Sequence, residues 1–236
     1  MRDILTPTAT DERRRGIGFV LLMTFAGLVS GVLTAALCVD HVSNGLGIPF
    51  GVTVALCLGL TGVTRSILRL AAVPILFGCT FVFSFFLTEM LELMAGERFV
   101  GTVEKNHLIA LFIGGMLGGF IVIRGSRILS KTEMTLTALA WDALWSILVG
   151  ALSPTAWELG PSLGMWLWSG LHAAGVTSPT NIFLNALYGE TGYGPLSRLF
   201  AVFIVWQTGM GFALGMTLRN IREKREPSSL QELKLS

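Results

Sequence analysis

The sequence predicts an all-α membrane protein, a bundle of six transmembrane helices with a short re-entrant or interfacial helical hairpin between the fifth and the sixth. Composition is the first observation: 52% of the 236 residues are hydrophobic and the mean hydropathy is +0.68. Only 14% are charged, against about 25% in a typical soluble domain. These values exclude a soluble globular protein, a disordered chain and a collagen-like fibre. Uncharged apolar runs and a one-sided distribution of basic residues are the other two observations.

Six apolar runs define the predicted spans, and all but the fifth are uncharged. A transmembrane helix needs about 20 such residues, and only helices can present these runs to lipid, because each backbone amide must bond within its own segment. The runs cover about residues 17–39, 48–64, 70–88, 108–123, 134–152 and 199–218. Together they form a single transmembrane domain, 17–218, between a leader (1–16) and a basic tail (219–236).

The first run is expected to remain in the mature protein. It has 23 uncharged residues, from 17 to 39, whereas the apolar region of a cleavable signal peptide has about 7–15. We therefore expect a retained first helix.

The segment 153–195 differs from the other connections. It holds four of the eight prolines, and its Trp-rich apolar centre, 162–176, has 15 residues. Such a helix is about 22 Å long, shorter than the roughly 30 Å hydrocarbon core. We expect an extracytoplasmic hairpin here; the alternative is a seventh span over 162–188.

Loop charges favour six spans. With the N-terminus inside, 14 of the 17 basic residues fall on the inner side, as expected for cytoplasmic loops of a membrane protein. A seventh span would place the basic tail outside. We therefore expect a multi-pass membrane protein with both termini cytoplasmic. The leader contains Asp3, Asp11 and Glu12, unlike an acid-poor organellar transit segment, so we expect a bacterial inner (plasma) membrane.

Glycine pairs spaced four apart occur in three of the predicted spans. Such pairs let a neighbouring helix backbone approach closely, and here they predict packing within one chain, with an oligomer interface as the alternative. The pairs are Gly27/Gly31, Gly114/Gly118, Gly115/Gly119 and Gly211/Gly215.

Asp142 is the one charged residue within the six runs. An ionisable group near the bilayer centre costs at least about 2.5–3.5 kcal/mol, so it needs polar partners. Thr135 and Ser146 lie on its helical stripe, and Gln207 and Thr208 in the last run are candidate partners. These five residues predict a polar seam that relays a proton or cation or contacts a polar substrate. The alternative is a neutral acid with a purely structural hydrogen bond.

The predicted outer face carries a second set of candidates, all histidines or carboxylates, which can bind metal ions. They are His41, Glu89, Glu92, His107, Glu158 and His172. Glu89 and Glu92 are three residues apart, but no pair has the close, regular spacing of a known metal site such as H-x-x-x-H, so we expect no metal site. The alternative to a functional role for these residues is an ordinary acidic outer surface.

Transport of a small solute or cation, with Asp142 as the coupling or gating group, is the leading functional hypothesis. Two alternatives are a non-catalytic membrane subunit and an enzyme acting at the outer leaflet through His172, Glu158 or Glu89. No nucleotide-binding, nucleophile-elbow or H-E-x-x-H motif occurs, so we expect no cofactor and regard an enzyme as the weaker hypothesis. Expected partners are membrane lipid and either a second copy or a membrane subunit, not nucleic acid.

Overall fold

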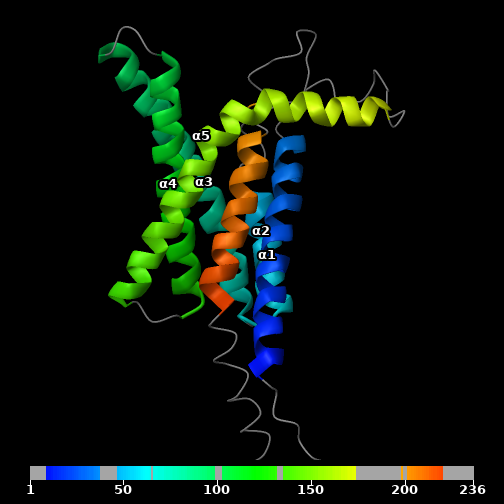
Figure 1. Cartoon of the computed structure of the whole chain (residues 1–236). Helices are drawn as coiled ribbons and strands as arrows, with labels where there is room; N and C mark the ends of the chain where they lie inside the picture. The colour runs from blue at the N-terminus through cyan, green and yellow to red at the C-terminus, as the bar shows by residue number, and fades with distance from the viewer. Residues whose placement is uncertain are drawn as a thin grey trace, which may run out of the picture.

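The computed structural model describes residues 9–37, 47–64, 66–98, 103–131, 135–173, 198 and 201–219. Within these ranges the regular elements are all helices (Figure 1). They are α1 (Ala9–Leu37), α2 (Ile48–Leu60), α3 (Ile67–Arg98), α4 (Val103–Leu129), α5 (Leu136–Ala173) and a C-terminal helix (Ala201–Arg219).

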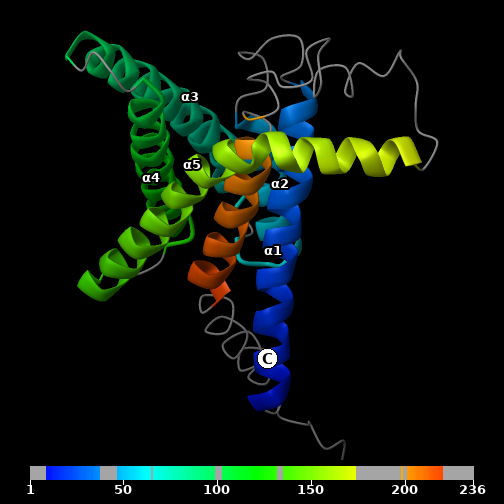
Figure 2. The same cartoon turned by 45° about the horizontal axis from the view of Figure 1, so that its top comes forward.

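Five of these helices are long and apolar enough to cross a membrane. The crossing segments are Gly16–Thr34, Ile67–Thr88, His107–Leu129, Leu136–Gly160 and Ala201–Arg219. α2 has only 13 residues, a length of about 20 Å. The helices alternate in direction, so the start of α1 and the end of the C-terminal helix lie at the same end of the bundle (Figures 1 and 2).

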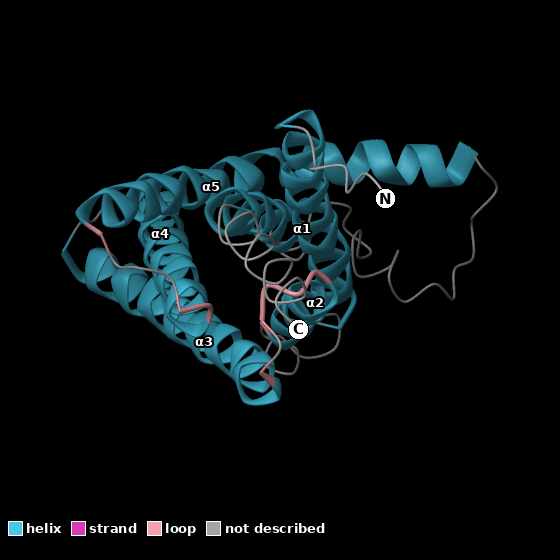
Figure 3. Cartoon of the chain, turned by 90° about the horizontal axis from the view of Figure 1, so that it is seen from below, coloured by secondary structure: helices cyan, strands magenta, loops and turns pink. Residues whose placement is uncertain are grey.

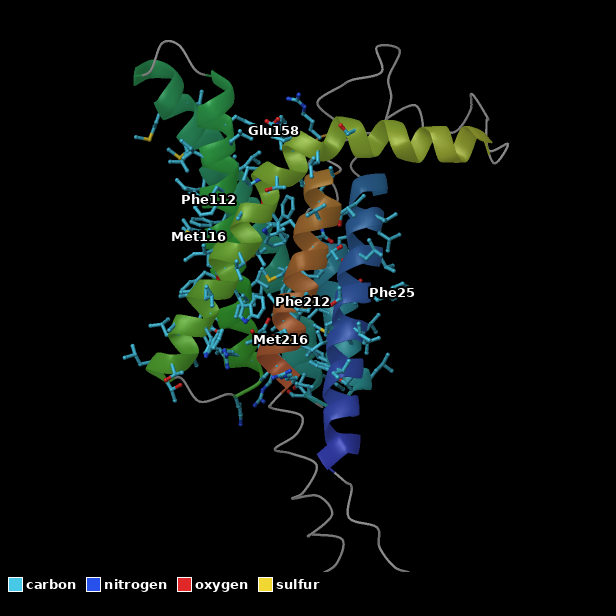
Figure 4. The ribbon with its side chains drawn as sticks, viewed as in Figure 1. Phe25, Phe112, Met116, Glu158, Phe212 and Met216 are labelled. Carbon is cyan, nitrogen blue, oxygen red and sulfur yellow. The ribbon has the colours of Figure 1, made fainter. Side chains whose placement is uncertain are left out.

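Large apolar side chains cover the outside of the bundle. Phe25 is 63% exposed and points from α1 away from the other helices (Figure 4). Leu21, Ile75 and Phe86 are similarly exposed. An apolar outer surface on long apolar helices is what lipid tails solvate, so the chain has the character of a multi-pass membrane protein.

The C-terminal helix forms the centre of the bundle. In the segment of this helix that could cross a membrane, 61% of the residues are buried, whereas the buried share is 18–44% in the other four crossing segments. Its aromatic rings pack against three other helices. Phe203 contacts Phe81 of α3 with ring centroids 5.4 Å apart, Trp206 contacts Phe50 of α2 at 6.2 Å, and Phe212 contacts Trp145 of α5 at 5.6 Å.

Glycines bring α1 and the C-terminal helix close together. A Cβ atom added at Gly27 or Gly31 would meet the backbone of the C-terminal helix, at Gln207 and Ile204 respectively. One added at Gly211 or Gly215 would meet the backbone of α1. The two helices therefore approach at a distance that larger residues do not permit.

α4 lies between α3 and α5 (Figure 3), and its glycines face both neighbours. A Cβ at Gly114 or Gly118 would meet hydroxyl-bearing side chains of α3, Thr88 and Ser84. One at Gly115 would meet Ser153 of α5. These small residues bring both neighbours close to α4, and so fix where α4 and α5 meet.

α5 differs from the expected span 134–152 followed by a separate short helix. It continues without interruption from Leu136 to Ala173. It bends near Glu158, so that its first part runs along α4 and its last part crosses one end of the bundle (Figures 1 and 4). Pro154 and Pro161 lie in this region, and proline bends a helix because it lacks the amide hydrogen and clashes with the preceding turn. The second half of the expected hairpin lies outside the described residues.

Candidate functional site

Asp142 lies closer to the end of a helix than the sequence predicts. The expected span 134–152 places it near the middle of the bilayer. α5 begins at Leu136, and its apolar segment extends to Gly160. Asp142 is therefore in the second turn, about 9 Å from the helix start. Its side chain is nevertheless completely buried.

Two arginines of α4 bind the Asp142 carboxylate, one at each oxygen. Arg127 donates from Nε to Oδ1 at 2.7 Å, and Arg124 donates from Nη1 to Oδ2 at 3.2 Å. The side chain of Arg127 is 11% exposed, that of Arg124 is 21% exposed, and that of Asp142 is 0% exposed. We call Arg124, Arg127 and Asp142 the ion-paired cluster.

Local sequence explains why these groups meet. Arg124 and Arg127 are three residues apart and so share a helix face. The connection between α4 and α5 is short, which makes them antiparallel neighbours. Arg127 lies in the last turn of α4 and Asp142 near the start of α5. The charge of Arg127 therefore complements the dipole of α4, which favours a cation at the helix C-terminus.

Two of the predicted seam residues support the start of α5. The Thr135 hydroxyl accepts a hydrogen bond from the Ala138 amide at 3.1 Å, which satisfies an amide that the first turn leaves without a helical partner. Ser146 donates to the backbone oxygen of Asp142 at 2.6 Å. Both thus act on the backbone around Asp142, whereas the carboxylate itself is held by arginines.

Gln207 and Thr208, the predicted partners of Asp142, bond elsewhere. Gln207 lies in a second buried cluster that joins the C-terminal helix to α1. Its Oε1 accepts from Ser30 at 2.8 Å, and its Nε2 donates to Thr34 at 3.0 Å. Thr208 donates to the backbone oxygen of Ile204 at 2.6 Å. The predicted polar seam is therefore divided between two separate places.

The fourth apolar run ends at 123, so the sequence places both arginine partners just outside the predicted span. In the structure α4 continues to Leu129. A pair of arginines spaced three apart, just beyond an apolar run and a short turn before an intramembrane acid, is the sequence signal that could have identified them.

The ion-paired cluster lies among further basic residues. Its two guanidinium groups face the one carboxylate of Asp142. Arg69 at the start of α3, Lys131 after α4 and Arg219 at the end of the C-terminal helix lie at the same end of the bundle. We call this end, where α4 ends and α5 begins, the basic end. In Figure 4, nitrogen-bearing side chains gather there.

The outer-face candidates that the structure describes lie toward the opposite end. The His107 ring is 4.1 Å from that of Trp157, over which the Arg198 guanidinium lies at 5.6 Å. Glu158 is exposed. Glu89, Glu92 and His172 lie in α3 and at the end of α5, where only the backbone is described, and His41 is outside the described residues. No group of three metal-ligating side chains occurs in the described part.

Comparisons with protein-family models, curated proteins and solved structures gave no match to the chain.

Proposed function

We propose that this multi-pass membrane protein moves a small solute across the membrane, and that the ion-paired cluster gates the pathway at the basic end. One observation carries the proposal: a completely buried carboxylate is held from both sides by arginines of the neighbouring helix at the point where α4 and α5 join. Intramembrane ionisable groups are enriched on substrate pathways.

A gate needs a contact that is strong when formed and that can be exchanged. α4 and α5 can separate at the basic end only if both Asp142 bonds break and the three charged groups find other partners. Buried ion pairs have this all-or-none character, because an unpaired buried charge is costly. Packed helices that exchange ion pairs switch between discrete arrangements.

The charges favour gating over cation binding. A cation approaching Asp142 would meet two guanidinium groups within hydrogen-bonding distance of the same carboxylate. Like charges repel strongly where water is excluded. Of the two roles that the sequence suggests for Asp142, coupling and gating, the arrangement therefore supports gating.

Reconstituted vesicles test the proposal. Protein in phosphatidylcholine vesicles is exposed to glycerol, potassium acetate or potassium phosphate, with valinomycin to balance charge, and the recovery of vesicle volume is followed by light scattering. We expect the wild type to speed recovery with at least one solute. Asp142→Asn should reduce that rate at least tenfold. A transporter that exposes its solute to the two sides of the membrane in turn must close each end in its cycle, and without Asp142 the basic end cannot close.

Asp11→Asn is the matched control, since it removes the same charge from the first turn of α1. It should retain wild-type flux. The proposal fails if the wild type speeds recovery with none of the three solutes, or if Asp142→Asn, folded by circular dichroism, transports as fast as the wild type.

A further inference from the structure

The two arginines of the ion-paired cluster bind Asp142 unequally. Arg127 makes the shorter contact with Asp142, 2.7 Å, and is the more buried arginine. Arg124 makes the longer one, 3.2 Å, and its side chain is 21% exposed. Arg124 is therefore the more exposed of the two arginines and the one that binds Asp142 at the longer distance.

A guanidinium group can bind a second anion while it keeps the first. It has five N–H donors in a planar fork. In the described part of the chain, Arg124 directs one of these donors, from Nη1, to Asp142. A guanidinium fork has the geometry that binds two oxygens of a phosphate group at once, and the Arg124 side chain is partly exposed.

The surroundings of the cluster place it where phosphate groups are abundant. Trp141, beside Asp142, is 54% exposed, and the apolar side chains of Ile128 and Leu136 are 59% and 82% exposed. Tryptophan and exposed arginine are typical of the level at which lipid tails meet headgroups. Arg69, Lys131 and Arg219 add positive charge at the same end of the bundle.

We infer that Arg124, supported by Arg127, binds a phosphate-bearing anion at the basic end. Two sources share this chemistry, the headgroup of an anionic lipid and free phosphate in the aqueous phase. The inference deepens the proposed function, because an anion that competes with Asp142 for the arginines would loosen the gate. No covalent step is involved.

Equilibrium binding in a neutral detergent tests the inference without a transport assay. Purified full-length protein is titrated with inorganic phosphate, with short-chain phosphatidylglycerol and with short-chain phosphatidylcholine, and heat release and tryptophan fluorescence are recorded. We expect saturable binding of phosphate, phosphatidylglycerol or both, and weaker binding of the zwitterionic lipid. Binding of phosphatidylglycerol alone identifies a lipid site, and binding of phosphate identifies a site open to water.

Three variants make the test specific. Arg124→Gln should weaken binding at least tenfold, and Arg124→Lys should weaken it several-fold, because lysine keeps the charge but loses the planar fork. Arg198→Gln, the same change at the opposite end, should bind like the wild type. Arg124→Gln leaves Asp142 paired with Arg127, so it should still fold, which its thermal unfolding midpoint checks.

The inference is overturned if neither anion binds the wild type at millimolar concentration, or if Arg124→Gln binds as tightly as the wild type. Glu133 lies in the connection between α4 and α5, outside the described residues, and Glu133→Gln is included for this reason. Binding that appears only in that variant would mean that the chain balances the cluster itself, and would also overturn the inference. Loss of binding in Arg124→Gln alongside unchanged flux in Asp142→Asn would refute the gate and leave the anion site standing.

Discussion

At the scale of single residues, the environment of Asp142 explains how an acid persists within an apolar helix. Each carboxylate oxygen has its own guanidinium donor, and the carboxylate is shielded from lipid. Removal of one partner from a buried pair costs about 3–5 kcal/mol, because the remaining charge is left uncompensated. The two arginines differ in distance and exposure, so their removal should have unequal effects.

Arg127→Gln should destabilise the protein more than Arg124→Gln. Arg127 is the closer and more buried partner, so we expect a loss of about 3 kcal/mol in the free energy of unfolding. For the more exposed Arg124 we expect about 1 kcal/mol, reduced by solvent screening. Unfolding in mixed detergent micelles measures both, with Arg198→Gln as the control. Equal losses for the two variants would contradict the unequal roles.

Gln207 should contribute more to stability than its neighbour Thr208. Gln207→Leu removes hydrogen bonds to Ser30 and Thr34 on another helix, each worth about 0.6 kcal/mol on average in a membrane protein. Thr208→Val removes a hydroxyl that bonds only within its own helix. The same unfolding assay should show a loss of about 1 kcal/mol for the first and less for the second. The reverse order would show that the Gln207 cluster does not join the helices.

At the scale of elements, close backbone contact is the feature that joins α1 to the C-terminal helix. Hydrophobic burial does not drive helices together in lipid, so packing and hydrogen bonds must do so. Gly27 contributes to the packing, since a Cβ atom there would meet the backbone oxygen of Gln207. Gly18, on the same helix, has open space where its Cβ would be.

These two glycines give a matched pair of substitutions. Gly27→Ala should lower the free energy of unfolding by about 1–3 kcal/mol, the usual cost of overpacking, because backbone atoms cannot rotate away as a side chain can. Gly18→Ala should be neutral or stabilising by up to about 1 kcal/mol, since alanine favours a helix. If both variants unfold alike, the close approach at Gly27 has no energetic importance.

Apolar runs predict where helices occur but not where they end. α3 continues to Arg98 and α1 begins at Ala9, because a helix persists in water beyond the lipid-solvated part. α5 passes through Pro154 and Pro161 as a bend, where the sequence suggested a break. The C-terminal helix is the most buried of the five crossing segments, and its apolar run does not reveal this, since burial depends on which helices surround an element.

At the scale of the whole molecule, the sequence predicts the membrane class and identifies Asp142 as the residue that needs partners. The identity of those partners could not be predicted from the sequence, because it depends on the relative register of α4 and α5. Gln207 has the right chemistry, yet it faces α1. Arg124 and Arg127 lie beyond the apolar run of α4, and they reach Asp142 because the helix continues to Leu129.

The orientation of the whole molecule is testable by chemical labelling. In a chain with its three cysteines replaced, Asn44→Cys should react with a membrane-impermeant maleimide from outside the cell, and Glu226→Cys should react only after the membrane is opened. This follows from the side on which basic residues collect. Labelling of both positions from outside would contradict six spans with cytoplasmic termini.

Closure of the basic end by the ion-paired cluster can be measured most directly at Ser126, a completely buried residue of α4 between the two arginines. In membranes, the rate at which an impermeant maleimide modifies Ser126→Cys in a chain lacking the native cysteines reports access to this end. We predict that adding Asp142→Asn raises that rate at least tenfold, while Ser30→Cys, buried between α1 and the C-terminal helix, stays unreactive. An unchanged rate at Ser126→Cys would contradict the gate.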